Sequence, residues 1–293
     1  MTRRLNHNAF VLVIALLVIA ICGTVLASCA RYSCQKALQA SEAQRELQMR
    51  WGAISCKETI LPAAESVLRE STEEKAPVLV ERPSRYLSLT LGGLTYHLLL
   101  SDEQAKMNIN TALRYRGKQG VTESLAVLQQ DMPIHLTQRI GTLETGGKDT
   151  SSASYSFFDD LLVYDRPAQL VSPTEPSQRI SSKITFWTDG RIHFRRASPA
   201  VLREAMKGIL DSSLLGQLLQ IRESLPDCTL GEAFSQMELK GTQQKQIFRY
   251  VTDQSNCHSL WVIVEGRSRL WHRLYISSPR GIVGTQTSRR YAW

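Results

Sequence analysis

The hydrophobic pattern predicts a membrane-spanning helix near the amino end. Residues 9–30 read AFVLVIALLVIAICGTVLASCA, 22 residues without a charged side chain. At about 1.5 Å per residue, a helix of this length extends roughly 33 Å and can cross the apolar part of a bilayer. Residues 1–8 form a short basic end with Arg3 and Arg4, which we expect to stay in the cytoplasm. We therefore predict a single-pass membrane protein with the bulk of its chain outside the cytoplasm, which is the periplasm if the cell is Gram-negative.

The helical pattern continues beyond the apolar run. Residues 31–75 form the predicted stem, and its first part is rich in Ala, Leu, Gln, Glu and Arg, which favour helices. Apolar residues such as Leu38 and Trp51 form a loose stripe at helical spacing. We expect Gly52 and Pro62 to bend this helix. The pattern predicts a membrane helix that continues outside the membrane as an amphipathic stem.

Period-two alternation predicts strands in the outer part of the chain. The clearest hairpin lies within residues 76–100, where alternating segments flank Gly92 and Gly93, because glycine takes the positive φ of a tight turn. The pattern predicts two more hairpins, one at residues 184–194 around Asp189-Gly190 and one at residues 260–276, within the closing hairpin and tail of residues 251–293.

Helical patterns lie between these hairpins. We predict an inserted helical domain at residues 101–250, made of two modules at residues 101–165 and 180–250. Its expected helices are residues 122–130, a helix capped by Ser198 with Pro199 at its first position, residues 214–222 and residues 229–237. The fold class is therefore α+β and pilin-like in outline: a long N-terminal helix packed on a small antiparallel sheet, with a large inserted helical domain.

Composition changes this picture little. The chain has 293 residues, of which 43% are hydrophobic and 21% charged, as in ordinary globular proteins. Its net charge of +8 is spread along the chain, so it does not by itself predict a nucleic-acid partner. Six cysteines are too few for a disulfide scaffold. Cys228 and Cys257 lie in the outer part, where an oxidising compartment makes a disulfide between them possible.

The sequence shows no pattern of catalytic residues. The carboxylates of Asp102-Glu103 and Asp159-Asp160 are adjacent in sequence, and adjacent side chains usually point apart. The six histidines have no metal-ligand spacing. We predict a protein that is not an enzyme, with no catalytic residue, no cofactor and no metal.

One motif carries a family resemblance. Residues 99–113 read LLSDEQAKMNINTAL, and Asp102, Glu103, Lys106, Asn108 and Asn110 occupy its polar positions. This string resembles the "DE-x-GK-(I/L)-N-(I/L)-N" signature of the K-type minor pseudopilins of bacterial type II secretion (the general secretion pathway protein K family). The usual glycine is Ala105 here. Residues 155–162, 190–202 and 228–234 resemble other helical parts of the family more weakly. In the family's Asn-Val-Asn-Thr string, the two asparagine positions are His193 and Arg195 here, and the threonine position is Arg196.

The physical interpretation of this motif is structural. Asparagine side chains bond to nearby backbone groups and tolerate tight bends, so Asn108 and Asn110 could fix the junction where a strand enters the helical insert. Asp102 and Lys106 are four residues apart and could pair if this segment is helical.

The resemblance implies a non-enzymatic subunit of a pilus-like filament, held in the bacterial cell inner membrane by a single span with the bulk of its chain in the periplasm. It implies that the insert caps the filament tip and that the partners are other minor pseudopilins and assembly-platform proteins of the inner membrane. The glutamate that most pilins carry early in the helix is absent, which fits a tip subunit. Some family members bind calcium, but the dense acidic cluster is missing here, which leaves Asp159 and Asp160 as weak candidates.

Alternatives remain open for processing and for function. A prepilin-like leader would be cleaved between Asn8 and Ala9, although such leaders usually end in glycine. Residues 26–29 (LASC) instead resemble a lipobox with Cys29 as the lipidated residue. The functional alternatives are a lipoprotein with an α+β binding domain, and a DNA-binding or DNA-uptake protein. The latter would use a helix-hairpin-helix-like segment at residues 198–222.

Overall fold

A computed structural model gives the arrangement of the chain. It describes the following residues: 4–69, 82–139, 154–172, 174–225, 228–237, 239, 241–265, 270–278 and 287–292. The chain divides into two compact units, Met1–Gly52 and Ala53–Trp293. In the first unit, the described residues 4–52 are helical.

Helix α1 (Arg4–Ile60) is continuous, and Gly52 does not interrupt it, contrary to the bend predicted there. It ends two residues before Pro62, because proline lacks an N–H donor and restricts the residue before it. A turn then leads to α2 (Ala64–Arg69). In the first unit, side chains from Phe10 to Gln44 are exposed. Among the described residues, α1 is the helix that is long and apolar enough to cross a membrane.

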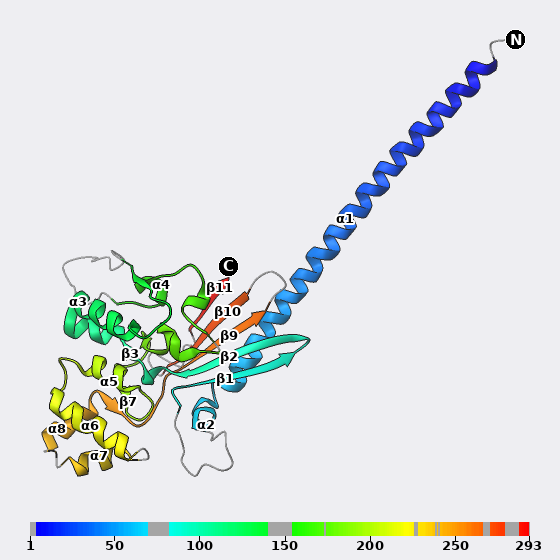
Figure 1. Cartoon of the computed structure of the whole chain (residues 1–293). Helices are drawn as coiled ribbons and strands as arrows, with labels where there is room; N and C mark the ends of the chain where they lie inside the picture. The colour runs from blue at the N-terminus through cyan, green and yellow to red at the C-terminus, as the bar shows by residue number, and fades with distance from the viewer. Residues whose placement is uncertain are drawn as a thin grey trace. The chain divides into compact units, whose positions relative to one another are not determined.

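The second unit contains a five-stranded antiparallel sheet (Figure 1). Its strands, in spatial order, are β1 (Ser84–Leu91), β2 (Leu94–Asp102), β9 (His258–Glu265), β10 (Leu270–Ser277) and β11 (Thr287–Ala292). The predicted first and third hairpins are confirmed as the pairs β1–β2 and β9–β10. Gly92 and Gly93 form the first turn with φ of 58° and 77°. The sequence pattern did not predict the edge strand β11.

Strand β2 pairs directly with β9, so residues 103–257 form an insertion between two neighbouring strands. Its longer helices are α3 (Ile109–Gln129), α5 (Pro199–Met206), α6 (Ser212–Ser224), α7 (Leu230–Gln236) and α8 (Gly241–Phe248). Its shorter elements are η1 (Glu103–Ala105), β3 (Met107–Asn108), β4 (Thr137–Gln138), α4 (Phe158–Leu161), β5 (Leu162–Val163), η3 (Pro167–Gln169), η4 (Pro176–Gln178), η5 (Ile180–Ser182), β6 (Ile184–Thr185), β7 (Ile192–His193) and β8 (Val251–Thr252). Figure 1 shows the longer helices gathered at one end of the sheet.

The predicted hairpin at residues 184–194 is wrong. Strand β6 pairs in parallel with β3, and β7 pairs in parallel with β8. The apolar positions in this segment face the core of the insert instead of forming one sheet face. Their backbone groups bond to segments that are distant in sequence, which alternation alone cannot reveal.

The helix predicted at residues 122–130 is the second half of α3. That helix starts at Ile109 and breaks at Gly117, where φ is 66° and ψ is −170°. Only glycine adopts this backbone region readily. The helices predicted after Ser198 and over residues 214–222 and 229–237 are confirmed as α5, α6 and α7, with Ser198 accepting a hydrogen bond from the Val201 N–H as N-cap.

The sheet is covered on both faces. On one face, Tyr275 lies beside the last turns of α1, where Lys57 Nζ is 5.8 Å from its ring centroid. Arg85 of β1 donates to the Val67 carbonyl of α2 at 2.9 Å. Cys56 and Leu68 are accordingly buried, although most of α1 is exposed. The predicted packing of the N-terminal helix on the sheet therefore involves the end of this helix.

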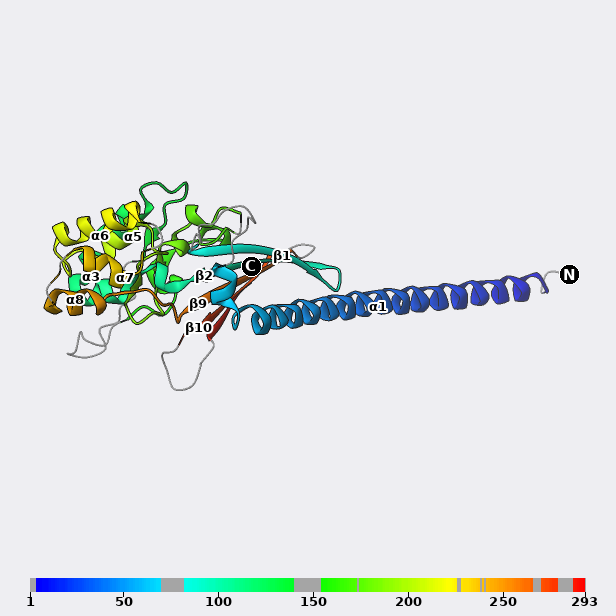
Figure 2. The same cartoon turned by 90° about the horizontal axis from the view of Figure 1, so that it is seen from below.

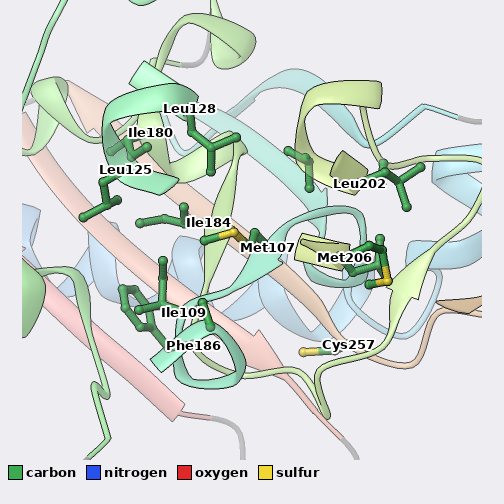
Figure 3. Close-up of a cluster of buried hydrophobic side chains, with 14 of the residues drawn as sticks. Met107, Ile109, Leu125, Leu128, Ile180, Ile184, Phe186, Leu202, Met206 and Cys257 are labelled. Carbon is green, nitrogen blue, oxygen red and sulfur yellow. The ribbon is translucent and has the colours of Figure 1, made fainter. Parts of the chain in front are cut away.

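The opposite face of the sheet supports the core of the insert. Trp261 and Leu274 of the sheet belong to the same buried cluster as the helices of the insert. Figure 3 shows part of this cluster, with labelled side chains from β3, α3, η5, β6, α5 and the segment before β9. Each large apolar side chain buried here contributes roughly 1.5–3 kcal/mol relative to exposure. The predicted fold class is thus confirmed: α+β, with a long N-terminal helix, a small antiparallel sheet and a helical insert.

Candidate functional site: a buried ionic junction

A cluster of charged side chains lies where the end of the stem, the sheet and the insert meet. We call it the ionic junction and define it as Glu65, Asp102, Glu103, Lys106, Arg196 and His258. Glu65 comes from α2, the next three come from the end of β2 and the turn after it, Arg196 follows β7, and His258 begins β9. Long-range contacts between these segments bring the six residues together.

Arg196 is the centre of the ionic junction. Its side chain is fully buried, and its guanidinium donates to both carboxylate oxygens of Glu65, at 3.0 Å and 2.9 Å. It also donates to Asp102 Oδ2 at 3.0 Å. Two-pronged arginine–carboxylate pairs of this kind fix orientation as well as distance. Arg196 therefore joins the insert to α2 and to the end of β2.

The pKa values at this site reflect the pairing. Burial acts to raise the pKa of Glu65, but hydrogen bonds from His258 and Arg196 and the charge of Arg196 outweigh it and hold this pKa well below its ordinary value. Burial likewise acts to lower the pKa of Arg196, but the hydrogen bonds and charges of Glu65 and Asp102 outweigh it and raise this pKa. Both groups are therefore held in their charged forms.

Glu103 and Lys106 form a second buried ion pair, with side chains 0% and 4% exposed. Ser259 of β9 donates a hydrogen bond to the same Glu103 oxygen. The expected pair of Asp102 and Lys106 is not formed. The reason is that residues 103–105 form the 3₁₀ helix η1, in which positions three residues apart lie on one side.

Asp102 instead faces Arg196, and its other oxygen accepts hydrogen bonds from the Gln104 N–H at 2.8 Å and from the Ser255 hydroxyl. His258 Nε2 lies 2.9 Å from Glu65 Oε1. The adjacent carboxylates of Asp102 and Glu103 thus have different partners, in keeping with the expectation that they point apart.

The two asparagines of the motif bond to backbone groups. Asn108 caps α3 by accepting from the Thr111 N–H at 3.0 Å, and it donates to the Thr188 carbonyl at 2.8 Å. Asn110 accepts from the Tyr155 N–H and donates to the Tyr155 carbonyl, both at 2.8 Å. These bonds hold the start of α3 to segments 45 to 80 residues later in the chain.

We predict that Asn110→Ala lowers the free energy of unfolding by about 1–3 kcal/mol, because both backbone groups of buried Tyr155 lose their partner. Amide hydrogen exchange at Tyr155 should accelerate in this variant. Asn256→Ala is the matched control, because Asn256 is exposed. Unchanged exchange at Tyr155 would contradict the bracing role of Asn110.

The lowered pKa of Glu65 predicts a pH dependence of stability. A carboxylate with a depressed pKa in the folded state stabilises the protein above its unfolded pKa of about 4.3, and this contribution is lost as the pH falls. The difference in melting temperature between the wild type and Glu65→Gln should therefore be largest near neutral pH and shrink progressively below about pH 4. A difference that stays constant between pH 7 and pH 3 would show that Glu65 is not held ionised by its partners.

The contacts of the ionic junction indicate a structural role, which is to hold the insert, the sheet and α2 together. Asp102, Glu103, Lys106 and Arg196 are buried and hydrogen-bonded to one another or to nearby side chains. Breaking one partner of a buried pair leaves the other charge uncompensated, which is costly. The ionic junction therefore resists separation of the insert from the sheet and from α2.

The other residues singled out in the sequence lie away from this site. Asp160 accepts from the N–H groups of Ser156 and Phe157, and Asp159 accepts from the Tyr164 hydroxyl. No group of three metal-ligating side chains lies together in the part of the chain that the structure describes. Asp159 and Asp160 are thus used in local hydrogen bonds near the start of α4.

The two cysteines of the outer part are not paired. Cys228 and Cys257 are both buried free thiols in the core of the insert, so the structure does not contain the disulfide that the sequence left possible. Burial raises the pKa of each thiol, which disfavours the reactive thiolate. Cys29 is exposed on α1, and the side chains of Asn8 and Ala9 lie outside the described residues.

Sequence reasoning identified half of this site. The motif supplied Asp102, Glu103 and Lys106, whereas Glu65 and His258 were not singled out, and Arg196 was noted mainly as a departure from the family pattern. Arg196 lies 131 residues from Glu65 in sequence. No local spacing could have paired them.

The chain is similar to a solved structure but matches no known family in sequence. No protein-family model matches this chain, and no curated protein matches it in sequence. Among solved structures, a chain from the GspK–GspI–GspJ complex of the type 2 secretion system of enterotoxigenic Escherichia coli is similar, at 13% identity and a TM-score of 0.43. The match covers 86% of this chain and 99% of that chain. Likeness at this level carries no functional assignment.

Proposed function

We propose that this chain is a non-enzymatic, minor-pseudopilin-like subunit of a type II secretion apparatus or a related pilus-like filament. In this proposal the apolar helix anchors the subunit in the bacterial inner membrane and later packs against the helices of neighbouring subunits. Its partners are other minor pseudopilins and assembly-platform proteins of the inner membrane. The helical insert occupies the filament tip.

The observation that carries the proposal is the continuity of α1. The helix runs from the apolar segment of residues 9–30 to Ile60 without a break, and its last turns are buried in the second unit. A membrane anchor that only tethered a soluble domain would not need an unbroken helix of 57 residues. Such a helix suits lateral packing against similar helices.

A stripe of small side chains along α1 supports this packing. Seven small residues recur at alternating spacings of three and four, and all are exposed: Ala20, Gly23, Ala27, Ala30, Cys34, Ala37 and Ser41. Small residues at such spacing let helix backbones approach closely in membranes. The stripe continues past the end of the apolar run, as expected for a stem that packs both inside and outside the bilayer.

The position of the insert supports a role at the tip. It is placed between two neighbouring strands and tied to the sheet and α2 by the ionic junction, so it moves with the sheet as one body. A large rigid body beside the sheet would block the addition of another subunit above it. This reasoning also agrees with the absence of an early glutamate in α1.

Particular features disfavour the two alternatives. A lipoprotein needs a flexible tether after its lipidated cysteine, but α1 continues as helix for 31 residues beyond Cys29, counting from residue 30 to residue 60. The DNA-binding alternative relies on basic residues near residues 198–222, yet Arg196 is buried in ion pairs and Arg191 pairs with Asp189. The connection between α5 and α6 contains one positive-φ glycine, Gly208, instead of a Gly-x-Gly turn.

The proposal is tested by cross-linking in living cells. A photo-reactive amino acid at Cys34, within the small-residue stripe, should capture the stem of another prepilin-like subunit when the full chain is expressed with its partners. The same group at Lys36 lies roughly 200° around the helix and should capture far less. Mass spectrometry identifies the captured chain. Equal capture at the two positions, or none, would count against lateral packing through this stripe.

A further inference from the structure

A basic and aromatic surface lies on the insert, away from the ionic junction. We call it the α3–α8 surface and define it as Arg114, Tyr115, Lys118, Lys245, Arg249 and Tyr250. The first three residues come from α3, and the others come from α8 and the turn after it. Figures 1 and 2 both place α3 and α8 at the same end of the insert.

The two halves of this surface meet at a tyrosine pair. The hydroxyls of Tyr115 and Tyr250 are 3.1 Å apart, and their rings are 6.0 Å apart at an angle of 80°. The Arg249 guanidinium lies 5.9 Å from the Tyr250 ring centroid, within the range of a cation–π contact. The Tyr115 side chain remains 48% exposed.

The charge of the α3–α8 surface is of one sign. Residues 109–122 and 241–252 together contain five basic side chains and no acidic one. Arg116 is paired with Glu204 at 3.5 Å, which leaves Arg114, Lys118, Lys245 and Arg249. All four are exposed, and none forms an ion pair within the part of the chain that the structure describes. Like charges gathered in this way favour an acidic partner.

We propose that the α3–α8 surface binds an acidic polypeptide segment of a partner protein. Tyrosine and arginine are the residue types that most often dominate protein–protein contacts. The two tyrosine rings meet edge-on with their hydroxyls bonded to each other, so they do not form a parallel platform on which bases would stack. This inference does not depend on the proposed filament role.

The test uses the full chain in detergent and a fluorescein-labelled peptide of repeated Glu-Glu-Leu-Tyr units as the probe. Fluorescence anisotropy at physiological ionic strength should show saturable binding. The double variant Lys245→Glu/Arg249→Glu should weaken binding at least about tenfold, because it reverses two charges at the contact. The control Arg166→Glu/Lys207→Glu changes the net charge equally at exposed positions outside the surface. It should weaken binding less than about threefold.

Several outcomes would overturn the proposal. Equal weakening by both double variants would mean that the peptide responds only to net charge. Absence of binding by the wild-type chain would reject the surface as an acidic-segment site. Random-sequence duplex DNA that binds more tightly than the peptide, and loses affinity with Lys245→Glu/Arg249→Glu, would identify the partner as nucleic acid instead. Circular dichroism of each variant separates loss of binding from loss of fold.

Discussion

Replacing Arg196 with Met is expected to lower the free energy of unfolding by about 3–5 kcal/mol. Methionine keeps much of the side-chain volume but removes the charge that bridges Glu65 and Asp102. Asp102 is completely buried, so its carboxylate would be left without its cation in a region that water does not reach. Urea unfolding monitored by tryptophan fluorescence measures the change, because Trp261 and Trp271 are buried in the sheet.

Arg191→Met is the matched control for this substitution. Arg191 also pairs with an aspartate, Asp189, at 2.7 Å, but the two side chains are 39% and 26% exposed. Exposed pairs of this kind contribute about 0–1 kcal/mol. A similar loss of stability in the two variants would show that burial of the Arg196 pairs has no special energetic role.

A rescue variant tests the physical cause. Adding Asp102→Asn to Arg196→Met removes the uncompensated charge but keeps an oxygen that can accept from the Gln104 N–H. The double variant should therefore recover part of the stability that Arg196→Met loses. If the double variant is less stable than Arg196→Met, lost packing around residue 196 is the dominant effect instead of unpaired charge.

The sequence predicted the parts of the fold that depend on local patterns. Residues 9–30 marked the apolar helix, the Gly92-Gly93 turn marked the first hairpin, and Ser198-Pro199 marked the start of α5. Each of these signals acts over a few residues, through period, turn geometry or capping. The same is true of the third hairpin, whose two alternating segments lie only a few residues apart in the sequence.

Other parts could not be predicted because they depend on distant partners. Strands β6 and β7 look like a hairpin in sequence, but each pairs with a segment elsewhere in the insert. The sequence pattern did not predict the first half of α3. Asn108 and Asn110 stabilise the start of this helix through bonds to Thr188 and Tyr155, which are distant in sequence. Arg196 and Glu65 lie 131 residues apart in sequence and are neighbours only in the folded chain. The motif thus contains three residues of the ionic junction, but it does not reveal their partners Glu65, Arg196 and His258.

Gly23→Leu is expected to leave the folding of the chain unchanged but to weaken its proposed assembly with partner subunits. Apart from its chain neighbours and the backbone of its own helix, no heavy atom lies within 4 Å of the position that a Cβ would occupy at Gly23, so the isolated helix can accept a larger side chain. Leucine is a better helix former than glycine, so this substitution should not destabilise the helix itself. In the proposed filament the same side chain would stand in the small-residue stripe and keep neighbouring stems apart, so co-purification of the proposed partner subunits should fall at least about tenfold.

Val25→Leu is the matched control for Gly23→Leu. Val25 is exposed and lies roughly 200° around α1 from Gly23, so it is outside the stripe. It also enlarges an apolar side chain in the same turn of the helix, and co-purification should stay within about twofold of the wild type, because no close helix contact is expected there. The amount of each variant in the membrane fraction shows whether insertion is unchanged. If Gly23→Leu assembles as well as Val25→Leu, the stripe does not contact neighbouring stems, and lateral packing must use another face of α1.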